Sequence, residues 1–131
     1  MTTKTYSVGD TFTLVRECDR YRPIYYAAVS GDFNPIHLDP EAAAFAGLGG
    51  PILHGLCTYG WATECFVNYL GDPARVKRVK VRFSKPVALE DVITFTGTVT
   101  SIANGVLSAE LSAKNQRGED VLKAAIVEGS V

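Results

Sequence analysis

An apolar stretch in the middle of the chain constrains the fold more than any other feature of the sequence. Residues 51–70 form the most apolar window, which a few polar or helix-breaking residues interrupt: Pro51, His54, Glu64 and Asn68. We therefore expect a buried helix rather than a membrane span, running from about His54 to Leu70 and capped by Gly71. Because it is apolar on most of its surface, such a helix must be covered by other elements nearly all round.

The second half of the chain reads as a series of strands that could cover this helix. At 76–83, "VKRVKVRF" alternates apolar and basic residues, so two faces are expected. The apolar face holds Val79, Val81 and Phe83, and the basic face holds Arg78, Lys80 and Arg82. Asn104-Gly105 joins "DVITFTGTVTSI" to "GVLSAELSAKN", and Asn-Gly is a strong hairpin signal. With a further turn at "NQRGED" before "VLKAAIVEGSV", these runs predict an antiparallel meander of about four strands.

The first half of the chain is predicted to be mostly helical, after a short strand at Thr11–Glu17. Asp19 is predicted as the N-cap of a helix that ends near Val29, with Pro23 tolerated only in its opening turn. Asp39 followed by a proline predicts the start of a second helix.

These elements predict an α+β domain in which a curved antiparallel sheet wraps around the long central helix, the arrangement of a single hotdog fold. A chain of 131 residues is long enough to bury a core of its own. Since no linker-like segment divides it, residues 1–131 are expected to form one domain.

Charge and cysteine content narrow the functional classes. A formal net charge of -1 gives no general attraction to nucleic acid or anionic membranes. Cys18, Cys57 and Cys65 are an odd set without metal-ligand spacing, so we expect no metal site and reduced thiols. Cys57 and Cys65, both on the predicted central helix, are expected to be buried. The first residues lack the apolar core of a secretory signal. A cytoplasmic protein that needs no membrane is therefore expected.

The segment "SGDFNPIHLDP" at 30–40 contains the residue types of general acid–base chemistry. Asp32 and His37 could exchange protons with a substrate, and Asn34-Pro35 prevents a continuous helix between them. A simple capped loop is the alternative interpretation. Apolar neighbours around the two polar residues favour a partly dry cavity, and a turn fixed by proline would hold their side chains in a defined geometry.

The segment "GGPILHGLCTYG" at 49–60 places a glycine in the first turn of the predicted central helix. Backbone N–H groups there lack intrahelical partners, and Gly55 would let a ligand carbonyl approach closely, so its amide could act as an oxyanion donor. The alternative is that Gly55 and Gly60 only allow close packing against the sheet. His54 is expected to be a buried, hydrogen-bonded histidine without a role of its own.

Six of the thirteen basic residues fall within eleven positions: Arg75, Lys77, Arg78, Lys80, Arg82 and Lys85. A solvated strand face is one explanation. The other is a binding site for a compact polyanion, such as the phosphates of coenzyme A, or for an acidic carrier protein. The cluster lacks the interleaved aromatic residues of a nucleic-acid site.

The two motifs resemble a known family. "YYAAVSGDFNPIHLDPEAA" followed by "GGPILHGLCTYG" resembles the hydratase-2 motif of MaoC-like proteins, the (R)-specific enoyl-thioester hydratases and dehydratases. "VRFSKPVALEDVITFTGTV" looks like the following strand, loop and strand of that family. The resemblance covers about residues 7–130, as one hotdog without the second repeat of the double-hotdog members.

The resemblance implies a role for each matched residue. Asp32 and His37 would be the catalytic pair, and the amide of Gly55 would be the oxyanion donor. The implied substrate-binding residues are Asn34, which would orient the loop, and Arg82 and Lys85, which would meet the phosphates. The implied reaction is hydration of a trans-2-enoyl thioester or the reverse dehydration, with no cofactor other than coenzyme A as part of the substrate.

The resemblance also implies a homodimer, or a heterodimer in which this chain would be the catalytic subunit. Two other functions stay open from the sequence. A hotdog thioesterase would need a carboxylate on the central helix, for which Glu64 is the candidate. A non-catalytic acyl-thioester-binding subunit is the second. Acyl chain length, carrier and reaction direction are not determined by the sequence.

Overall fold

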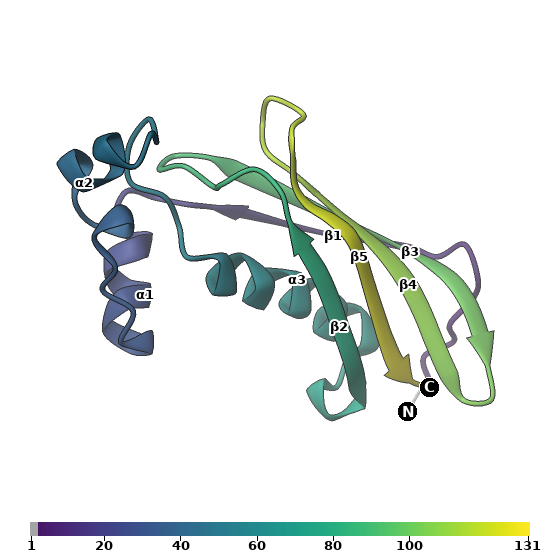
Figure 1. Cartoon of the computed structure of the whole chain (residues 1–131). Helices are drawn as coiled ribbons and strands as arrows, with labels where there is room; N and C mark the ends of the chain where they lie inside the picture. Colours follow the sequence, from purple (N-terminus) through teal and green to yellow (C-terminus); the bar gives the residue numbers. More distant parts are fainter. Residues whose placement is uncertain (1–2) are drawn as a thin grey trace.

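In the computed structural model, which describes residues 3–131, five strands form one antiparallel sheet. The strands are β1 (Thr11–Glu17), β2 (Val76–Phe83), β3 (Val92–Ala103), β4 (Val106–Lys114) and β5 (Asp120–Ser130), in the spatial order β1-β3-β4-β5-β2 (Figure 1). The predicted four-strand meander is therefore correct only for β3, β4 and β5. β2 pairs with β5 at the far edge, because the segment after β2 crosses to the opposite side of the sheet before β3 begins.

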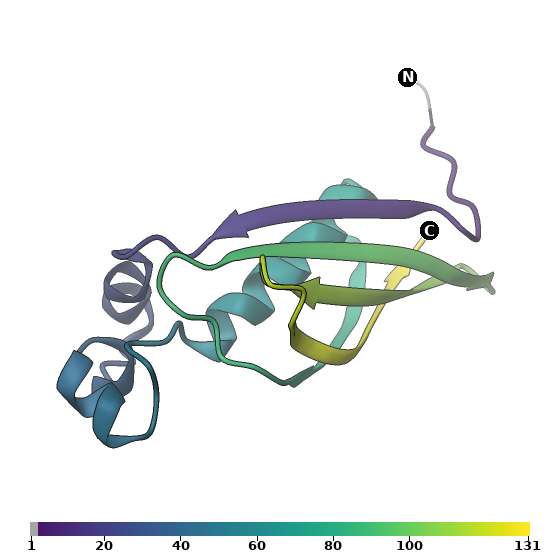
Figure 2. The same ribbon diagram turned by 90° about the horizontal axis from the view of Figure 1, so that it is seen from above.

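The central helix α3 (Gly55–Leu70) lies along one face of this curved sheet (Figures 1 and 2). One side of the helix is buried against the sheet through Trp61, Ala62, Cys65, Phe66 and Leu70. The predicted α+β fold with a sheet curved around one long helix is confirmed. The prediction that other elements cover nearly the whole surface of this helix is wrong for the single chain. Leu56, at 65% exposure, and Gly60 face away from the sheet.

Phe66 and Gly129 show how closely helix and sheet approach. A Cβ atom built at Gly129 of β5 would lie 3.2 Å from the ring of Phe66 and 2.6 Å from Leu70. The ring of Phe66 also packs near Phe12 of β1, with 6.0 Å between centroids. The core therefore depends on a large side chain from the helix fitting over a strand position without one.

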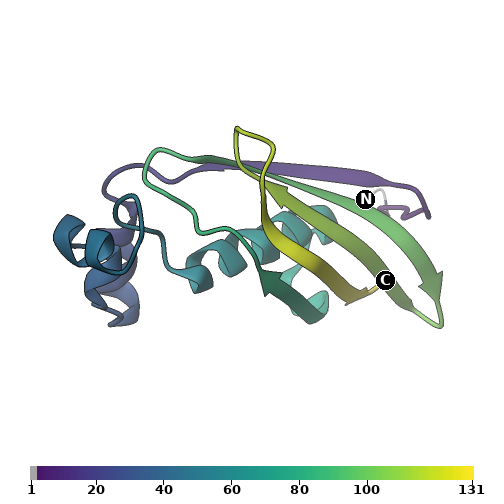
Figure 3. The ribbon, with the colours of Figure 1, turned by 45° about the horizontal axis from the view of Figure 1, so that its top comes forward.

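Smaller elements form a layer beyond one end of the sheet (Figures 1 and 3). They are α1 (Arg22–Ser30), the 3₁₀ turn η1 (Pro35–His37) and α2 (Pro40–Phe45), while a second 3₁₀ turn, η2 (Pro73–Arg75), follows α3. Asp39 caps α2 as predicted, accepting from the N–H of Glu41 at 2.9 Å. Asp19 is not the N-cap of α1. Tyr21 occupies that position, and Asp19 instead accepts from the Tyr21 N–H at 2.9 Å, because the chain makes one further turn before the helix begins.

The predicted hairpin at Asn104-Gly105 is confirmed. Both residues have positive φ, 54° and 74°, as a type I′ turn requires. The predicted alternation in β2 holds only in part, because Val79 and Val81 are half-buried whereas Phe83 is 51% exposed. Register shifts in the pairing of β2 with β5 flank Val79, and Phe83, beyond the second shift, places its ring beside Gly55 at the start of α3. Among the described helices, none combines the length and apolar character needed to cross a membrane.

Candidate active site

The loop after α1 presents Asp32 in a fixed backbone geometry. Gly31 ends α1 in the left-handed conformation, with φ of 78°, and turns the chain back. The Asp32 N–H then donates to Ser30 Oγ at 3.1 Å, and Asp32 Oδ1 accepts from the Asn34 N–H at 3.2 Å. These bonds leave the second carboxylate oxygen, Oδ2, free on a side chain that is 51% exposed.

His37 ends the 3₁₀ turn η1 and is buried, at 8% exposure. Its Nδ1 lies 2.7 Å from the carbonyl oxygen of Ile52, so Nδ1 carries a proton and donates it. Nε2 is thereby turned toward Asp32, with 3.9 Å between Nε2 and Oδ2. This separation is too long for a direct hydrogen bond, and it suits a small group that contacts both atoms.

Gly55 begins α3 immediately after its N-cap, His54. The amide of Gly55 belongs to the first helical turn, where the backbone offers no intrahelical acceptor and the helix dipole favours negative charge. The ring of Phe83 lies 3.2 Å from the position that a Cβ atom at Gly55 would occupy. A glycine is therefore what keeps the space beside this amide open.

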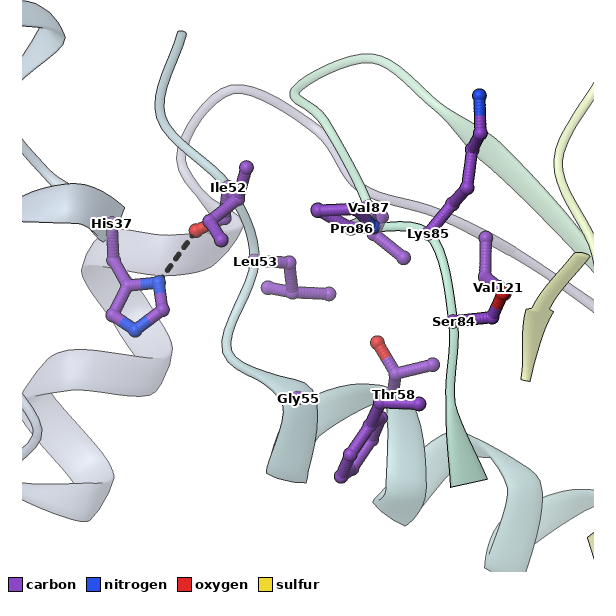
Figure 4. A pocket seen from close by; sticks show the side chains of 11 residues that line it. His37, Ile52, Leu53, Gly55, Thr58, Ser84, Lys85, Pro86, Val87 and Val121 are labelled. Carbon is purple, nitrogen blue, oxygen red and sulfur yellow. Dashed lines mark hydrogen bonds between the residues drawn. The ribbon is translucent and has the colours of Figure 1, made fainter. Parts of the chain in front are cut away.

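A cavity of about 190 Å³ adjoins His37 and Gly55 (Figure 4). Its walls are largely apolar and come from the start of α3 and the residues before it, from the end of β2 and the segment after it, and from β5: Leu53, Thr58, Phe83, Pro86, Val87 and Val121. Of the predicted site residues, the structure brings His37, Gly55 and Lys85 to this cavity. Asp32 approaches His37 from outside its walls, and neither Asn34 nor Arg82 contributes to them.

Asn34 has a structural part in the loop, because its side-chain oxygen accepts from the Ile36 N–H at 3.3 Å and caps η1. This agrees with the predicted orienting role, while contact with substrate stays a prediction. Lys85 forms an ion pair with Glu119 beside the cavity. Glu119 also accepts from Arg117 Nε at 2.7 Å, and Arg117 bonds the buried carboxylate of Asp91 at 3.2 Å. The β4–β5 turn is thus tied to the cavity wall.

This network holds two carboxyl groups in their ionised form. Hydrogen bonds from Lys85, then from Arg117 and Asn115, lower the pKa of Glu119 to about 2. Burial by itself raises the pKa of Asp91, but hydrogen bonds from Gln116, Ala88 and Arg117 outweigh it, so the pKa lies below the usual 3.8.

We expect the free energy of unfolding to fall as the pH is lowered from 4.5 toward 2. The unfolded chain takes up protons on these two carboxyls at a higher pH than the folded chain, so acid favours unfolding. Urea titrations at a series of pH values measure the slope. Arg117→Met removes a partner of both carboxyls and should flatten it, whereas Arg20→Met, outside the network, should leave it unchanged. An identical slope in wild type and Arg117→Met would contradict the assignment.

All three cysteines are free and buried, which confirms the burial predicted for Cys57 and Cys65 and adds that of Cys18. Burial raises the pKa of Cys18 to about 12 and that of Cys65 to about 11, and it raises the pKa of Cys57 as well. Thiols in this state are poor nucleophiles. Glu64, the candidate carboxylate of a hydrolase, bonds Arg16 of β1 and does not line the cavity.

His54 is the residue that the sequence interpretation missed. It was expected to be satisfied, but its Nδ1 is buried without a hydrogen-bond partner in the described part of the chain. Its Nε2 lies 2.8 Å from the carbonyl oxygen of Asp32, and its ring stacks on that of His37. No pattern in the sequence predicted this stacking, because the two histidines are brought together only when the loop and the helix start meet.

Ligand atoms of Asp32, His37 and His54 lie within 4.8 Å of one another, a spacing that a metal ion could use. The geometry does not suit one. The two rings are stacked at 22° between planes, so their in-plane lone pairs run side by side instead of converging. In addition, Nε2 of His54 is committed to the Asp32 carbonyl.

Comparison with known proteins places this site in a family. The family model of the MaoC like domain matches residues 11–119. The chain belongs to the MaoC-like family. The match runs from β1 to the turn before β5 and includes the loop with Asp32 and His37 as well as the start of α3, so the predicted resemblance is confirmed.

Relatives within this family carry hydratase and dehydratase names. The chain is 37% identical over 102 residues to 3-hydroxyacyl-thioester dehydratase Y of Mycobacterium tuberculosis, covering 76% of this chain and 33% of that protein. The R-hydratase PhaJ1 of Pseudomonas aeruginosa is 26% identical, with a TM-score of 0.85, over 94% of this chain and 80% of that one. A chain of the ChsH1-ChsH2 complex from Mycobacterium tuberculosis is 25% identical, with a TM-score of 0.88, over 97% of this chain and 99% of that one.

The curated relatives are mostly much longer than this chain. It spans a third of the dehydratase above and between 8% and 22% of four other curated relatives. Family membership thus describes the MaoC-like domain, and the activity, substrates and partners of this chain are taken up below.

Proposed function

We propose that the chain catalyses (R)-specific hydration of trans-2-enoyl thioesters and the reverse dehydration of 3-hydroxyacyl thioesters. The single observation that carries the proposal is the 3.9 Å gap between Asp32 Oδ2 and His37 Nε2, next to a cavity that Gly55 also lines. A pair of proton-accepting atoms at this spacing can hold one water molecule between them. The names of the dehydratase and R-hydratase relatives agree with this chemistry.

In the proposed hydration step, the thioester carbonyl accepts a hydrogen bond from the Gly55 amide. Water held by Asp32 and His37 adds its oxygen to C3 of the enoyl group, while the pair accepts one proton from that water. The electron pair of the double bond moves toward the carbonyl oxygen, where the amide stabilises the charge. The pair then delivers a proton to C2, which restores the carbonyl, and dehydration follows the same steps backwards.

The tautomer of His37 supports this role. Since Nδ1 donates to the Ile52 carbonyl, Nε2 has its lone pair directed toward the water position. The apolar walls formed by Leu53, Val87 and Val121 would surround the acyl part of the substrate and exclude further water.

Lys85 is our candidate for contact with the phosphates of coenzyme A or of an acyl carrier. It lines the cavity, and its ion pair with Glu119 shows that a negative group can reach its ammonium. Arg82 is exposed and lies outside the cavity walls, so a contact with phosphates would need the substrate to extend along β2.

A dimer is part of the proposal, because the single chain leaves the edge strands β1 and β2 and the Leu56 side of α3 uncovered. The similarity to a chain of the ChsH1-ChsH2 complex supports association with a second hotdog chain, identical or not. In a mixed pair, this chain would be the catalytic partner, since it contains Asp32, His37 and Gly55 together.

Hydration of crotonyl-CoA by the purified chain, followed as loss of enoyl-thioester absorbance, tests the proposal. We expect turnover without release of free thiol, and a product that an (S)-specific 3-hydroxyacyl-CoA dehydrogenase does not oxidise. Thiol release would mean that the site is a thioesterase. A folded chain that is inactive on short, long and branched enoyl thioesters, alone and with a catalytically impaired hotdog partner, would contradict catalysis by this chain.

A further inference from the structure

His54 connects the three groups to which the proposed reaction is assigned. It precedes Gly55 in the chain, it bonds the backbone of Asp32, and its ring lies against His37. It is 2% exposed and does not line the cavity, so it has no path to the substrate. Any role in the reaction must therefore be exerted through its neighbours.

The hydrogen bond from His54 to the backbone carbonyl of Asp32 restrains a residue whose side chain is only loosely packed. The side chain of Asp32 is 51% exposed, so packing alone does not hold its carboxylate in place. Its backbone is held on both sides instead, by Ser30 Oγ at the N–H and by His54 Nε2 at the carbonyl, at 3.1 and 2.8 Å. Without the second bond, this carbonyl would lose its partner and the loop could rotate Oδ2 away from His37.

The ring contact acts on His37. The two imidazole centroids are 3.8 Å apart with 22° between planes, and Tyr26 of α1 lies 4.7 Å from His54 at 50°. The His54 ring therefore lies close to both His37 and Tyr26. It gives His37 a flat wall and limits rotation of its ring away from Ile52.

One nitrogen of His54 is buried without a hydrogen-bond partner among the residues that the structure describes, which lowers the stability of the fold. That a histidine nevertheless occupies this position indicates that its other nitrogen is needed. Because Nε2 donates to a carbonyl, it carries the proton and Nδ1 is left with a lone pair. That lone pair is buried without a donor in the described residues 3–131, which costs stability relative to an apolar ring of similar shape. A phenyl ring would provide the flat wall without this cost, but it could not donate to the Asp32 carbonyl.

We propose that His54 is a positioning residue of this site: its Nε2–H fixes the Asp32 backbone, and its ring fixes His37, so that Oδ2 and Nε2 keep their separation. As far as it concerns turnover, this inference rests on the function proposed above. His54 exchanges no proton with the substrate and is not a catalytic residue.

Two substitutions separate the donor from the ring. His54→Gln keeps an N–H at the distance of Nε2 but removes the ring, and His54→Phe keeps a ring but removes the donor. We expect kcat for enoyl-thioester hydration to fall about 10²-fold in His54→Phe, with KM changed less than about threefold, because misplacement of reacting groups acts on the chemical step. In His54→Gln, kcat should stay within about tenfold of wild type. Equal losses in the two variants would overturn the assignment of the donor.

A spectroscopic measurement tests the inference without any turnover. The chain has two histidines, both in this site, so long-range ¹H–¹⁵N spectra can be assigned with His37→Ala as reference. We expect the Nε2–H tautomer for His54 and the Nδ1–H tautomer for His37. In His54→Phe, which keeps a ring but lacks the donor, the amides of residues 32–37 should exchange faster than in His54→Gln, while His37 should keep the Nδ1–H tautomer. In His54→Gln, which lacks the ring, the His37 signals should shift toward a mixture of tautomers.

The outcomes distinguish the two proposals. If wild type shows these tautomers and the exchange difference but no hydration of enoyl thioesters, the proposed function fails and the positioning of Asp32 by His54 stands. If wild type is active but His54 carries its proton on Nδ1, the positioning inference fails. Should His54→Phe not fold, as judged by circular dichroism, the tautomer of the wild type and the kcat of His54→Gln still decide the question.

Discussion

His37→Ala and Asp32→Asn should each lower kcat for hydration of crotonyl-CoA by about 10³-fold, within the range that a positioned acid or base contributes. His37→Ala removes Nε2, which is held 3.9 Å from Asp32 Oδ2, and Asp32→Asn replaces a proton-accepting oxygen with an amide. The two losses should not add in the double variant, because in the proposed mechanism the two residues hold one water molecule together. Steady-state kinetics of the two single variants and the double variant measure this.

Asp39→Asn is the matched control. It removes a carboxylate two positions from His37, but asparagine caps a helix as well as aspartate does, so α2 should persist. Its kcat should equal that of wild type. Urea unfolding of every variant is needed in parallel, because His37→Ala also deprives the Ile52 carbonyl of its hydrogen bond. Turnover near the wild-type value in folded Asp32→Asn would remove Asp32 from the catalytic pair.

Phe66→Ala should lower the free energy of unfolding by about 3–5 kcal/mol, as is typical of a fully buried phenylalanine. Phe66 is 0% exposed and fills the space between α3 and the sheet, over Gly129 and near Phe12. The glycine cannot close the resulting cavity, because it has no side chain to move into it. Urea unfolding at constant pH measures the difference.

Phe45→Ala serves as the control for this loss, since Phe45 of α2 is 97% exposed. The same chemical change there should alter the free energy of unfolding by no more than about 0.5 kcal/mol. Comparable losses in the two variants would mean that Phe45 is covered in the protein as it exists in solution, for example by a second chain. Oligomeric state measured for both variants would resolve that case.

The site combines a rigid helix start with a loop that is held by many short-range bonds. The position of Gly55 is fixed by α3, which packs on the sheet through residues such as Trp61 and Phe66. Asp32 owes its position to local bonds with Ser30 and Asn34 and to His54. The geometry of the candidate site therefore depends on the contact between the layer formed by α1, η1 and α2 and the beginning of α3.

Local patterns determined a large part of the structure. Asn104-Gly105 specified a type I′ hairpin because both residues accept positive φ, and Asp39 before a proline specified the start of α2. The apolar run from 54 to 70 specified the central helix. The motif around Asp32 and His37, with Gly55 downstream, specified the family. Each of these features is written in neighbouring residues, so the sequence alone reveals it.

The tertiary structure decided what depends on residues far apart in the chain. β2 pairs with β5 and not with β3, because packing over the helix determines the partner of an edge strand, whereas order in the sequence does not. Tyr21 occupies the N-cap position expected for Asp19, and Phe83, although 51% exposed, places its ring beside Gly55 of α3. His54 stacks on His37, which lies 17 residues earlier in the chain. Each ring is also held by a hydrogen bond to a backbone carbonyl, that of Asp32 for His54 and that of Ile52 for His37. Such contacts leave no periodic pattern, because a carbonyl group accepts a hydrogen bond whatever side chain it belongs to.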